Sequence, residues 1–326
     1  MRATVIGAGV AGLTSALALA ERGVRVTLLE REPRPGGNAS WLAGGMLAPF
    51  CEGESASRSV VTAGKRALDW WAARVPGVQR LGTLVVAPPR DGSEIDRFAA
   101  RTSDFARVDE ARIAELEPDL AGRFRRGLFF AGEGHLDPRA ALGALADGLI
   151  ARGGEIRFGV DGEALAKDVG VVLDCRGFEA RARLPELRGV RGEMMRIRSP
   201  DVALTRVVRF LHPRIPLYVV PRGGGEYMIG ATMIESAERG GMSVRSALEL
   251  LGAAYALHPA FGEAEILEMS AGVRPAYPDN EPRVLERGGR IFVNGAYRHG
   301  FLLSPSLAEQ AADMAMAMGA ATLVEA

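Results

Sequence analysis

The sequence predicts an α/β fold with two parts: one built on a parallel sheet, and one of α+β type built on a mostly antiparallel sheet. Three observations favour this prediction. The chain begins with a strand, a helix and a second strand, the unit from which parallel sheets are made. The apolar run at 169–177 suits a strand that is covered on both faces. From Gly189 to Met269, apolar and polar residues alternate, which is typical of antiparallel strands.

The first strand and helix are separated by a glycine turn that contains Gly7, Gly9 and Gly12. Gly7 permits a tight turn, Gly9 lets the backbone approach a pyrophosphate, and Gly12 lets the helix pack closely on the strand. The free N–H groups at the start of the helix bind phosphate. Glu30 ends the second strand, where an acid accepts hydrogen bonds from a ribose hydroxyl. The sequence therefore predicts a Rossmann-type dinucleotide site.

The charges of the chain argue against several classes of partner. The 326 residues include 40 basic and 40 acidic side chains, and no block of one sign stands out. We therefore expect no nucleic acid and no anionic membrane as a partner. The four histidines are dispersed along the sequence, so no metal site is expected.

Three further features bear on the location of the protein. A basic residue followed by an apolar run at the N-terminus is also typical of a signal peptide, but glycines inside the run and Glu21-Arg22 after it argue against export. No apolar run reaches the length of about 18 residues needed to span a membrane. The two cysteines, Cys51 and Cys175, form no CxxC motif and are expected to be buried fillers. A cytoplasmic location is expected.

Residue periodicity, caps and turns predict the remaining elements. Helices are predicted at 59–73, 94–102, 109–116, 139–152, 243–255 and 306–318. Asp109 is the expected N-cap of one helix, and Asp137-Pro138 opens another. Strands are predicted at 3–6, 24–29, 81–87, 128–130, 156–160, 169–177, 193–198, 217–221, 227–231 and 290–295.

Two observations favour a flavin over a nicotinamide cofactor. The glycine turn begins near residue 3, and the chain returns to an α/β pattern only around 294–304. This organisation predicts a discontinuous, Rossmann-type FAD-binding domain of residues 1–80, 133–180 and 274–326. Residues 81–132 and 181–273 are then expected to form the substrate-binding domain.

Several blocks spread over the chain resemble the D-amino-acid oxidase family of flavoproteins. They are residues 1–31, Gly44-Gly45-Met46-Leu47, Tyr218-Val219-Val220-Pro221-Arg222, Gly230-Ala231-Thr232-Met233, Gly272-Val273-Arg274-Pro275 and 297–305. Within the family, the likeness is greatest to the glycine oxidases of thiamine biosynthesis. The glycine turn is common to many families, whereas the later blocks are more specific to this one.

The resemblance implies four substrate-binding residues. Arg274 corresponds to the arginine that pairs with the substrate carboxylate, a role that suits the two-pronged guanidinium. Tyr218 corresponds to a tyrosine whose hydroxyl reaches the same carboxylate. Met233 corresponds to a residue whose backbone carbonyl faces the substrate amine. Arg298 corresponds to a second arginine near the pocket, and its role is left open between substrate contact and loop anchor.

The resemblance also implies a set of FAD-binding residues. A loop at 296–302 would follow the flavin ring, and the 44–46 backbone would pass beside it. His299 in that loop is expected to be structural, not a base. No cysteine lies between Ser270 and Pro282, so the flavin is expected to be non-covalent. The predicted cofactor-binding residues are Gly7, Gly9, Val10, Ala11, Gly12, Glu30, Arg31, Gly44, Gly45, Met46, Val160, Gly177, Ala296, Tyr297, Arg298, His299, Gly300, Phe301 and Leu302.

In this family a hydride passes from the amine-bearing carbon to the flavin, and no catalytic side-chain acid or base is needed. The pocket blocks agree, since neither the Tyr218 nor the Arg298 segment contains Asp or Glu. The resemblance implies oxidation of glycine or another small amino acid with O2 as the acceptor. The imine would go to hydrolysis or to thiazole synthase as a partner, and a homo-oligomer is left open.

Other functions stay open from the sequence alone. A D-amino-acid or sarcosine oxidase or dehydrogenase would share the same carboxylate-binding residues, because one methyl group is worth only ~1–3 kcal/mol of discrimination. A flavin-binding protein without turnover would keep the cofactor residues and need no Arg274. A NAD-dependent dehydrogenase is a third alternative, which the flavin spectrum of the purified protein would exclude.

Overall fold

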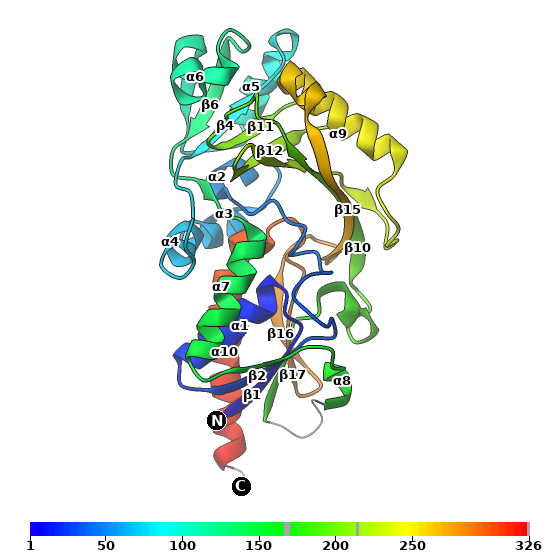
Figure 1. The fold of residues 1–326 in the computed structure, drawn as a ribbon. Helices are drawn as coiled ribbons and strands as arrows, with labels where there is room; N and C mark the ends of the chain where they lie inside the picture. The colour runs from blue at the N-terminus through cyan, green and yellow to red at the C-terminus, as the bar shows by residue number, and fades with distance from the viewer. Residues whose placement is uncertain (166–169, 213–214, 325–326) are drawn as a thin grey trace.

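A computed structural model describes residues 1–165, 170–212 and 215–324. It consists of two sheet-based parts stacked end to end, with both termini at the far end of the first part (Figure 1). The predicted α/β fold class is confirmed. Strands of the two sheets come from segments that alternate along the chain, which suits a discontinuous domain arrangement. The exact domain boundaries stay a prediction.

The first sheet has the strand order β16-β17-β9-β1-β2-β8. All neighbouring strands are parallel except β16 and β17, which form an antiparallel pair. The predicted strand at 169–177 is β9, and its Val169 lies outside the described residues. The strand bounds are β1 (Arg2–Ile6), β2 (Arg25–Leu29), β8 (Glu155–Arg157), β9 (Val171–Asp174), β16 (Arg283–Arg287) and β17 (Arg290–Asn294).

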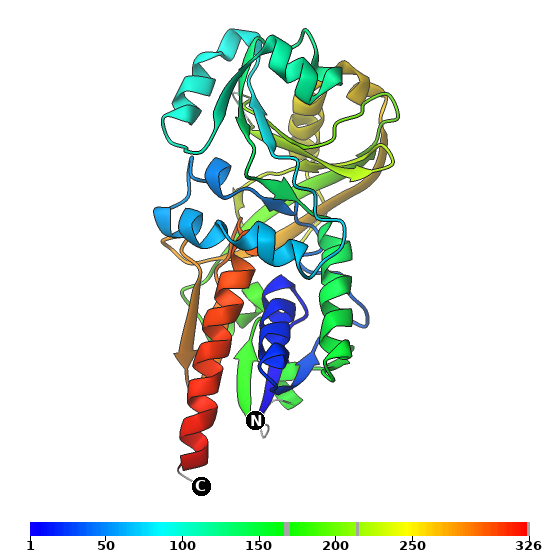
Figure 2. The ribbon, with the colours of Figure 1, turned by 90° about the vertical axis from the view of Figure 1, so that its left-hand side faces the viewer.

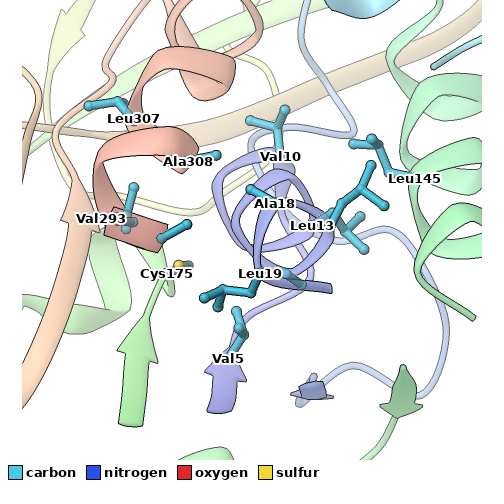
Figure 3. Packing of buried hydrophobic residues seen from close by; sticks show 14 of the residues in the cluster. Val5, Val10, Leu13, Ala18, Leu19, Leu145, Cys175, Val293, Leu307 and Ala308 are labelled. Carbon is cyan, nitrogen blue, oxygen red and sulfur yellow. The ribbon is translucent and has the colours of Figure 1, made fainter. Parts of the chain in front are cut away.

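Helix α1 (Val10–Glu21) lies between α7 (Pro138–Ala151) and α10 (Gly300–Val324) on this sheet (Figure 2). Figure 3 shows Leu13 and Ala18 of α1 between Leu145 of α7 and Leu307 of α10, above Val5 of β1. These apolar contacts fix the start of α1 at the carboxyl end of β1. The glycine turn is therefore held where three buried elements meet.

The second sheet has the strand order β14-β10-β13-β12-β11-β4-β6-β5, and β15 pairs with β10. Its neighbouring strands are antiparallel except β11 and β4, which are parallel. Figure 1 shows β10 and β15 descending from this sheet toward the first one. The strand bounds are β4 (Thr83–Val86), β5 (Ala106–Asp109), β6 (Arg126–Phe130), β10 (Arg188–Arg198), β11 (Val207–Phe210), β12 (Leu217–Gly223), β13 (Glu226–Gly230), β14 (Ile234–Glu235) and β15 (Glu265–Ala276).

Helices α5 (Ser93–Ala99), α6 (Glu110–Leu116) and α9 (Val244–Leu257) cover the second sheet. Leu250 of α9 packs with Val219 and Ile229 of the strands beneath it. Asp109 caps α6 and Asp137 caps α7, each accepting backbone N–H groups of the first turn, so both predicted caps are confirmed. The remaining short elements are β3 (Met46–Leu47), α2 (Pro49–Glu52), α3 (Arg58–Gly64), α4 (Ala67–Ala72), β7 (Gly134–His135) and α8 (Gly162–Leu165).

The prediction of one helix at 59–73 is wrong, because the chain bends at 65–66 and forms α3 and α4. Both helices contact α10, and the bend lets both reach it. Gly64, the last residue of α3, lies against Leu302 of α10: a Cβ at Gly64 would be 2.8 Å from Leu302 Cγ. The contact with α10 thus overrides the regular periodicity of the segment.

The predicted start of the last helix at Ser306 is also wrong, since α10 begins at Gly300 and contains Pro305. A proline inside a helix lacks the N–H that bonds the carbonyl four residues earlier, here that of Phe301. The indole Nε1–H of Trp71 donates to the Phe301 carbonyl at 2.7 Å. A helix that continues through Pro305 is therefore stabilised from outside, by a side chain of α4.

Candidate active site and cofactor cavity

A cavity of about 1140 Å³ lies between the two sheets. Its walls come from the glycine turn after β1, the end of β2, the 44–46 segment, strands β10, β12 and β15, and the start of α10. Of the residues predicted to bind cofactor or substrate, Gly12 and Val160 do not line it. The predicted residues that do are Gly7, Gly9, Val10, Ala11, Glu30, Arg31, Gly44, Gly45, Met46, Gly177, Tyr218, Met233, Arg274, Ala296, Tyr297, Arg298, His299, Gly300, Phe301 and Leu302.

The glycine turn presents backbone to this cavity. Gly7 has φ +100°, a conformation that favours glycine. A Cβ at Gly12 would lie 1.8 Å from the Gly7 carbonyl oxygen, so Gly12 permits the close contact of α1 with the turn without lining the cavity. Gly9 is the N-cap residue of α1, and since it has no side chain it makes no capping hydrogen bond. The N–H of Val10, the first residue of the helix, donates to Ser40 Oγ at 3.0 Å. The positive end of α1 thus faces the space where a pyrophosphate would bind.

Glu30 lies at the other side of the turn. Its Oε2 accepts a hydrogen bond from the Ala8 N–H at 2.6 Å, and its Oε1 accepts from the Glu32 N–H at 3.0 Å. Val160, which does not line the cavity, donates its backbone N–H to the Glu30 carbonyl at 3.1 Å. The structure thus gives Glu30 a role in holding the turn, beside its predicted contact with ribose.

The segment that contains Gly44 and Gly45 is held tightly against the second sheet. A Cβ at Gly44 would lie 2.9 Å from Tyr218 Cε2, and a Cβ at Gly45 would lie 2.3 Å from the Leu136 carbonyl oxygen. Arg222 donates to the Gly44 carbonyl at 2.8 Å and to the Leu136 carbonyl at 3.1 Å. Burial lowers the pKa of Arg222 to about 10, so it is charged at neutral pH. Arg222 therefore fixes the backbone that was predicted to pass beside the flavin.

The predicted substrate residues come together at the end of the cavity below the second sheet. The Arg274 guanidinium on β15 donates to the Thr232 carbonyl at 3.1 Å and lies across Gly192 of β10, where a Cβ would be 2.2 Å from its Nη2. Tyr218 on β12 is close by, and burial raises the pKa of its hydroxyl. Met233 is 53% exposed, and its Sδ accepts from the Tyr297 hydroxyl at 3.3 Å. This end of the cavity thus presents a cation and a neutral hydroxyl.

The predicted loop at 296–302 is a turn followed by the first residues of α10. Tyr297 has φ +44° and donates its N–H to the Pro275 carbonyl at 3.1 Å. The His299 N–H donates to the Ala296 carbonyl at 2.7 Å. Gly300 then begins the helix, so the positive end of α10 faces the cavity. The start of α10 thus brings positive potential to the cavity.

The structure adds an acidic residue that the sequence analysis did not place near the pocket. Glu52 ends α2, is 5% exposed and lines the cavity. Its Oε2 lies 3.0 Å from Arg298 Nη2 and 3.4 Å from His299 Nδ1, and its Oε1 lies 3.1 Å from Arg209 Nη1. Burial alone would raise the pKa of Glu52, but the guanidiniums of Arg298 and Arg209 outweigh it and lower the pKa to about 2. A glutamate in an apolar stretch shortly after Met46 was the available signal.

Within the described ranges, no group of His, Cys, Asp and Glu side chains is arranged to hold a metal ion. Cys51 and Cys175 are both buried free thiols. Among the helices that the structure describes, none is long and apolar enough to cross a membrane.

Residues 2–314 match the model of a protein family named DAO, which is described as FAD dependent oxidoreductase. The chain belongs to this family. It is 58% identical over 313 residues to a protein of Rhizobium etli that is named as a thiamine biosynthesis oxidoreductase, ThiO, with 96% of this chain and 95% of that protein covered. It is 32% identical over 328 residues to the D-amino-acid oxidase of Rubrobacter xylanophilus, with coverage of 96% and 95%.

Solved structures agree on the fold. The glycine oxidase of Bacillus cereus superposes with a TM-score of 0.80 at 23% identity, over 97% of this chain and 95% of that one. The family match and the Rhizobium etli relative show that the protein is an enzyme, an FAD-dependent oxidoreductase. The cavity fits FAD, since the start of α1, whose N-cap Gly9 has no side chain, lines it where a pyrophosphate can bind, and the Gly44–Gly45 backbone lines it as well.

Proposed function

We propose that this flavoenzyme oxidises glycine or another small amino acid to its imine, with O2 as the electron acceptor. The observation that carries the proposal is Arg274, a half-buried guanidinium at the end of the FAD cavity that donates to one backbone carbonyl, that of Thr232. A guanidinium fork in a dry pocket matches a carboxylate. The names of the relatives from Rhizobium etli and Rubrobacter xylanophilus support an amino-acid substrate and a role in thiamine biosynthesis.

In this proposal, Arg274 and Tyr218 bind the substrate carboxylate and thereby orient the α-carbon. Arg274 pairs with the substrate carboxylate, and the Tyr218 hydroxyl, whose raised pKa keeps it neutral, donates a second hydrogen bond to it. FAD, when bound, supplies the acceptor for the hydride that leaves the α-carbon. Precise orientation of that carbon is the main contribution of the pocket.

Among the described side chains at this end of the cavity, none is a suitable base. Glu52 has a pKa of about 2 and is paired with Arg298 and Arg209. His299 is held beside the same carboxylate. The substrate is therefore expected to react with its amine already neutral, so that the rate of flavin reduction should rise with pH toward the pKa of the free amine.

The proposal is tested by adding glycine, sarcosine or D-alanine to the yellow protein without oxygen and following the flavin absorbance. Reduction fastest with glycine, followed by reoxidation in air, is the expected result. Faster reduction by D-alanine or sarcosine would assign the substrate to the alternative classes. Reduction without recovery in air would show a dehydrogenase, and no reduction by any of them would overturn the proposal.

Replacing Arg274 distinguishes an enzyme of this specificity from a flavin-binding protein without turnover. Arg274→Met keeps the apolar stem and removes the charge, and it should raise the KM for glycine at least a hundredfold while FAD stays bound. Removal of one partner of a buried ion pair costs about 2–5 kcal/mol. Arg198→Met, which removes a half-exposed arginine of β10 paired with Glu226, is the control and should leave KM unchanged.

We also propose that the imine passes to a thiazole synthase, as the thiamine role of the Rhizobium etli relative suggests. An imine in water hydrolyses to ammonia and a 2-oxo acid, so direct transfer would protect it. Adding thiazole synthase with its other substrates to the oxidising enzyme should reduce the ammonia released for each glycine consumed. An unchanged ammonia yield would mean that no transfer takes place.

A further inference from the structure

Charged side chains gather at the substrate end of the cavity. The described residues that line the cavity include a group of five around Arg274: the guanidiniums of Arg209, Arg274 and Arg298 and the carboxylates of Glu52 and Glu54. Arg209 and Glu52 are buried, so their interactions are little screened by water. How these charges pair decides how many anionic groups the pocket can accept.

Within this described group, Arg274 is the cation that no carboxylate pairs with. Glu52 bridges Arg298, at 3.0 Å, and Arg209, at 3.1 Å, and Arg209 also lies 3.7 Å from Glu54. Arg298 has a further hydrogen bond to Ser55 Oγ at 3.2 Å. In the described part of the chain, no carboxylate lies within ion-pair distance of Arg274. Within this group of five, three positive and two negative charges leave a net positive charge of about one, at Arg274.

The neighbouring histidine does not alter this balance. His299 Nδ1 lies 3.4 Å from Glu52, which would favour its charged form. Burial, the largest influence, lowers the pKa of His299 below its usual value, and nearby Arg298 acts in the same direction. His299 is therefore neutral at the mildly alkaline pH at which the pocket would be assayed.

We infer that Glu52 is a specificity-determining residue: by occupying the guanidinium of Arg298 it limits this pocket to substrates with a single carboxylate, which binds Arg274. This inference rests on the proposed amino-acid substrate. A second carboxylate on a ligand would meet an arginine that is already paired, and it would lie near the negative charge of Glu52. Removing that charge frees the Arg298 fork, which then offers a second carboxylate site beside the first.

The test uses the FAD-loaded enzyme and carboxylates that have no amine to oxidise. Dissociation constants for acetate, malonate and succinate are measured at pH 8 by titration of the flavin spectrum, for wild type and for Glu52→Gln. The glutamine is nearly isosteric and keeps an oxygen that accepts from Arg209. We expect the affinity for malonate or succinate, relative to acetate, to rise at least tenfold in Glu52→Gln. An unchanged ratio for both dicarboxylates would overturn the inference.

Two further variants show whether Arg298 is responsible. In Glu52→Gln/Arg298→Gln, the gain for dicarboxylates should disappear, and its persistence would contradict the inference. Glu54→Gln is the matched control, because Glu54 also lines the cavity and contacts Arg209 and Arg101 but has no ion pair with Arg298. The ratio should stay within about twofold of wild type, and a gain equal to that of Glu52→Gln would assign the effect to overall charge instead.

Glu52→Gln removes the carboxylate that pairs with Arg298 and the buried Arg209, which can prevent folding, so a variant that keeps the negative charge is also tested. Glu52→Asp keeps the carboxylate and shortens it by one methylene, so it reaches Arg298 less well and should give a smaller gain in the same direction. A decrease in relative dicarboxylate affinity would contradict the inference even where Glu52→Gln does not fold. Because these anions bind without turnover, the outcome is independent of whether glycine proves to be the substrate.

Discussion

The indole of Trp71 donates a hydrogen bond to the carbonyl of Phe301 at 2.7 Å, and that carbonyl is the one that Pro305 leaves without its helical partner. Trp71 is fully buried, and its ring also packs on the Phe301 ring at a centroid distance of 5.4 Å. The first turn of α10 lines the FAD cavity. One side chain from α4 therefore supports the helix end that faces the cofactor.

This contact predicts that Trp71→Phe destabilises the protein. The variant leaves the Phe301 carbonyl buried without a donor, at a cost of about 1–3 kcal/mol, and the smaller ring leaves a small void. Urea denaturation measures the loss. In a Pro305→Ala background the restored N–H can bond Phe301, so Trp71→Phe should cost less there. Equal costs in the two backgrounds would show that the hydrogen bond does not compensate for the proline.

Arg222 provides a second prediction, for cofactor binding. Arg222→Met keeps the length of the side chain but removes the donors to the Gly44 and Leu136 carbonyls. The 44–46 backbone should loosen, and the FAD dissociation constant, measured by adding FAD to apoprotein, should rise at least tenfold. Arg196→Met is the control, because Arg196 is paired with Glu226 and lies outside the cavity lining. An unchanged FAD affinity in Arg222→Met would show that this backbone holds its place without the arginine.

Gly192 gives a third prediction, which separates substrate binding from cofactor binding. A Cβ at Gly192 would lie 2.2 Å from Arg274 Nη2, so Gly192→Ala must displace the guanidinium. Acetate affinity and glycine KM should each worsen at least tenfold while FAD stays bound. Gly143→Ala in α7, where a Cβ meets no atom within 4 Å, should change neither. Retention of full acetate affinity in Gly192→Ala would mean that Arg274 does not hold the carboxylate.

Local signals in the sequence were sufficient for much of the fold. The glycine turn, the caps Asp109 and Asp137 and the alternating strands each depend on residues close in sequence, and the structure confirms them. The residues around Gly7 and Tyr218 were placed by a turn motif and a family resemblance, and the structure brings them to one cavity. Their roles in binding stay predictions.

The missed features depend on contacts between distant parts of the chain. Glu52 meets Arg298 across 246 residues, and no spacing rule reports such a pair. Proline is a reliable local signal against a helix interior. Here Trp71, more than 200 residues earlier in the chain, donates the hydrogen bond that the Phe301 carbonyl loses because of Pro305. Similarly, the bend between α3 and α4 accompanies the contact that both helices make with the distant α10. Tertiary contacts thus override local preference mainly beside the cofactor cavity.

A last prediction concerns Glu133, a fully buried carboxyl between β6 and β7. Its Oε1 accepts from the Cys51 N–H at 2.7 Å, next to Glu52, and burial raises its pKa to about 8. Below the pKa of the unfolded chain, near 4.5, both states bind the proton and the stability is complete. As the pH rises toward 8, only the unfolded chain releases the proton, so stability falls by up to about 1.4 kcal/mol per pH unit.

Glu133→Gln removes this dependence, because the amide keeps an acceptor for Cys51 and carries no charge at any pH. We expect the free energy of unfolding of the variant to exceed that of wild type by an amount that grows from pH 5 to pH 8 and then levels off. Urea denaturation of both proteins at each pH measures the difference. Parallel curves over this range would show that Glu133 is ionised in the folded protein, and then its unpaired charge would have to be offset by the neighbouring dipoles of α2.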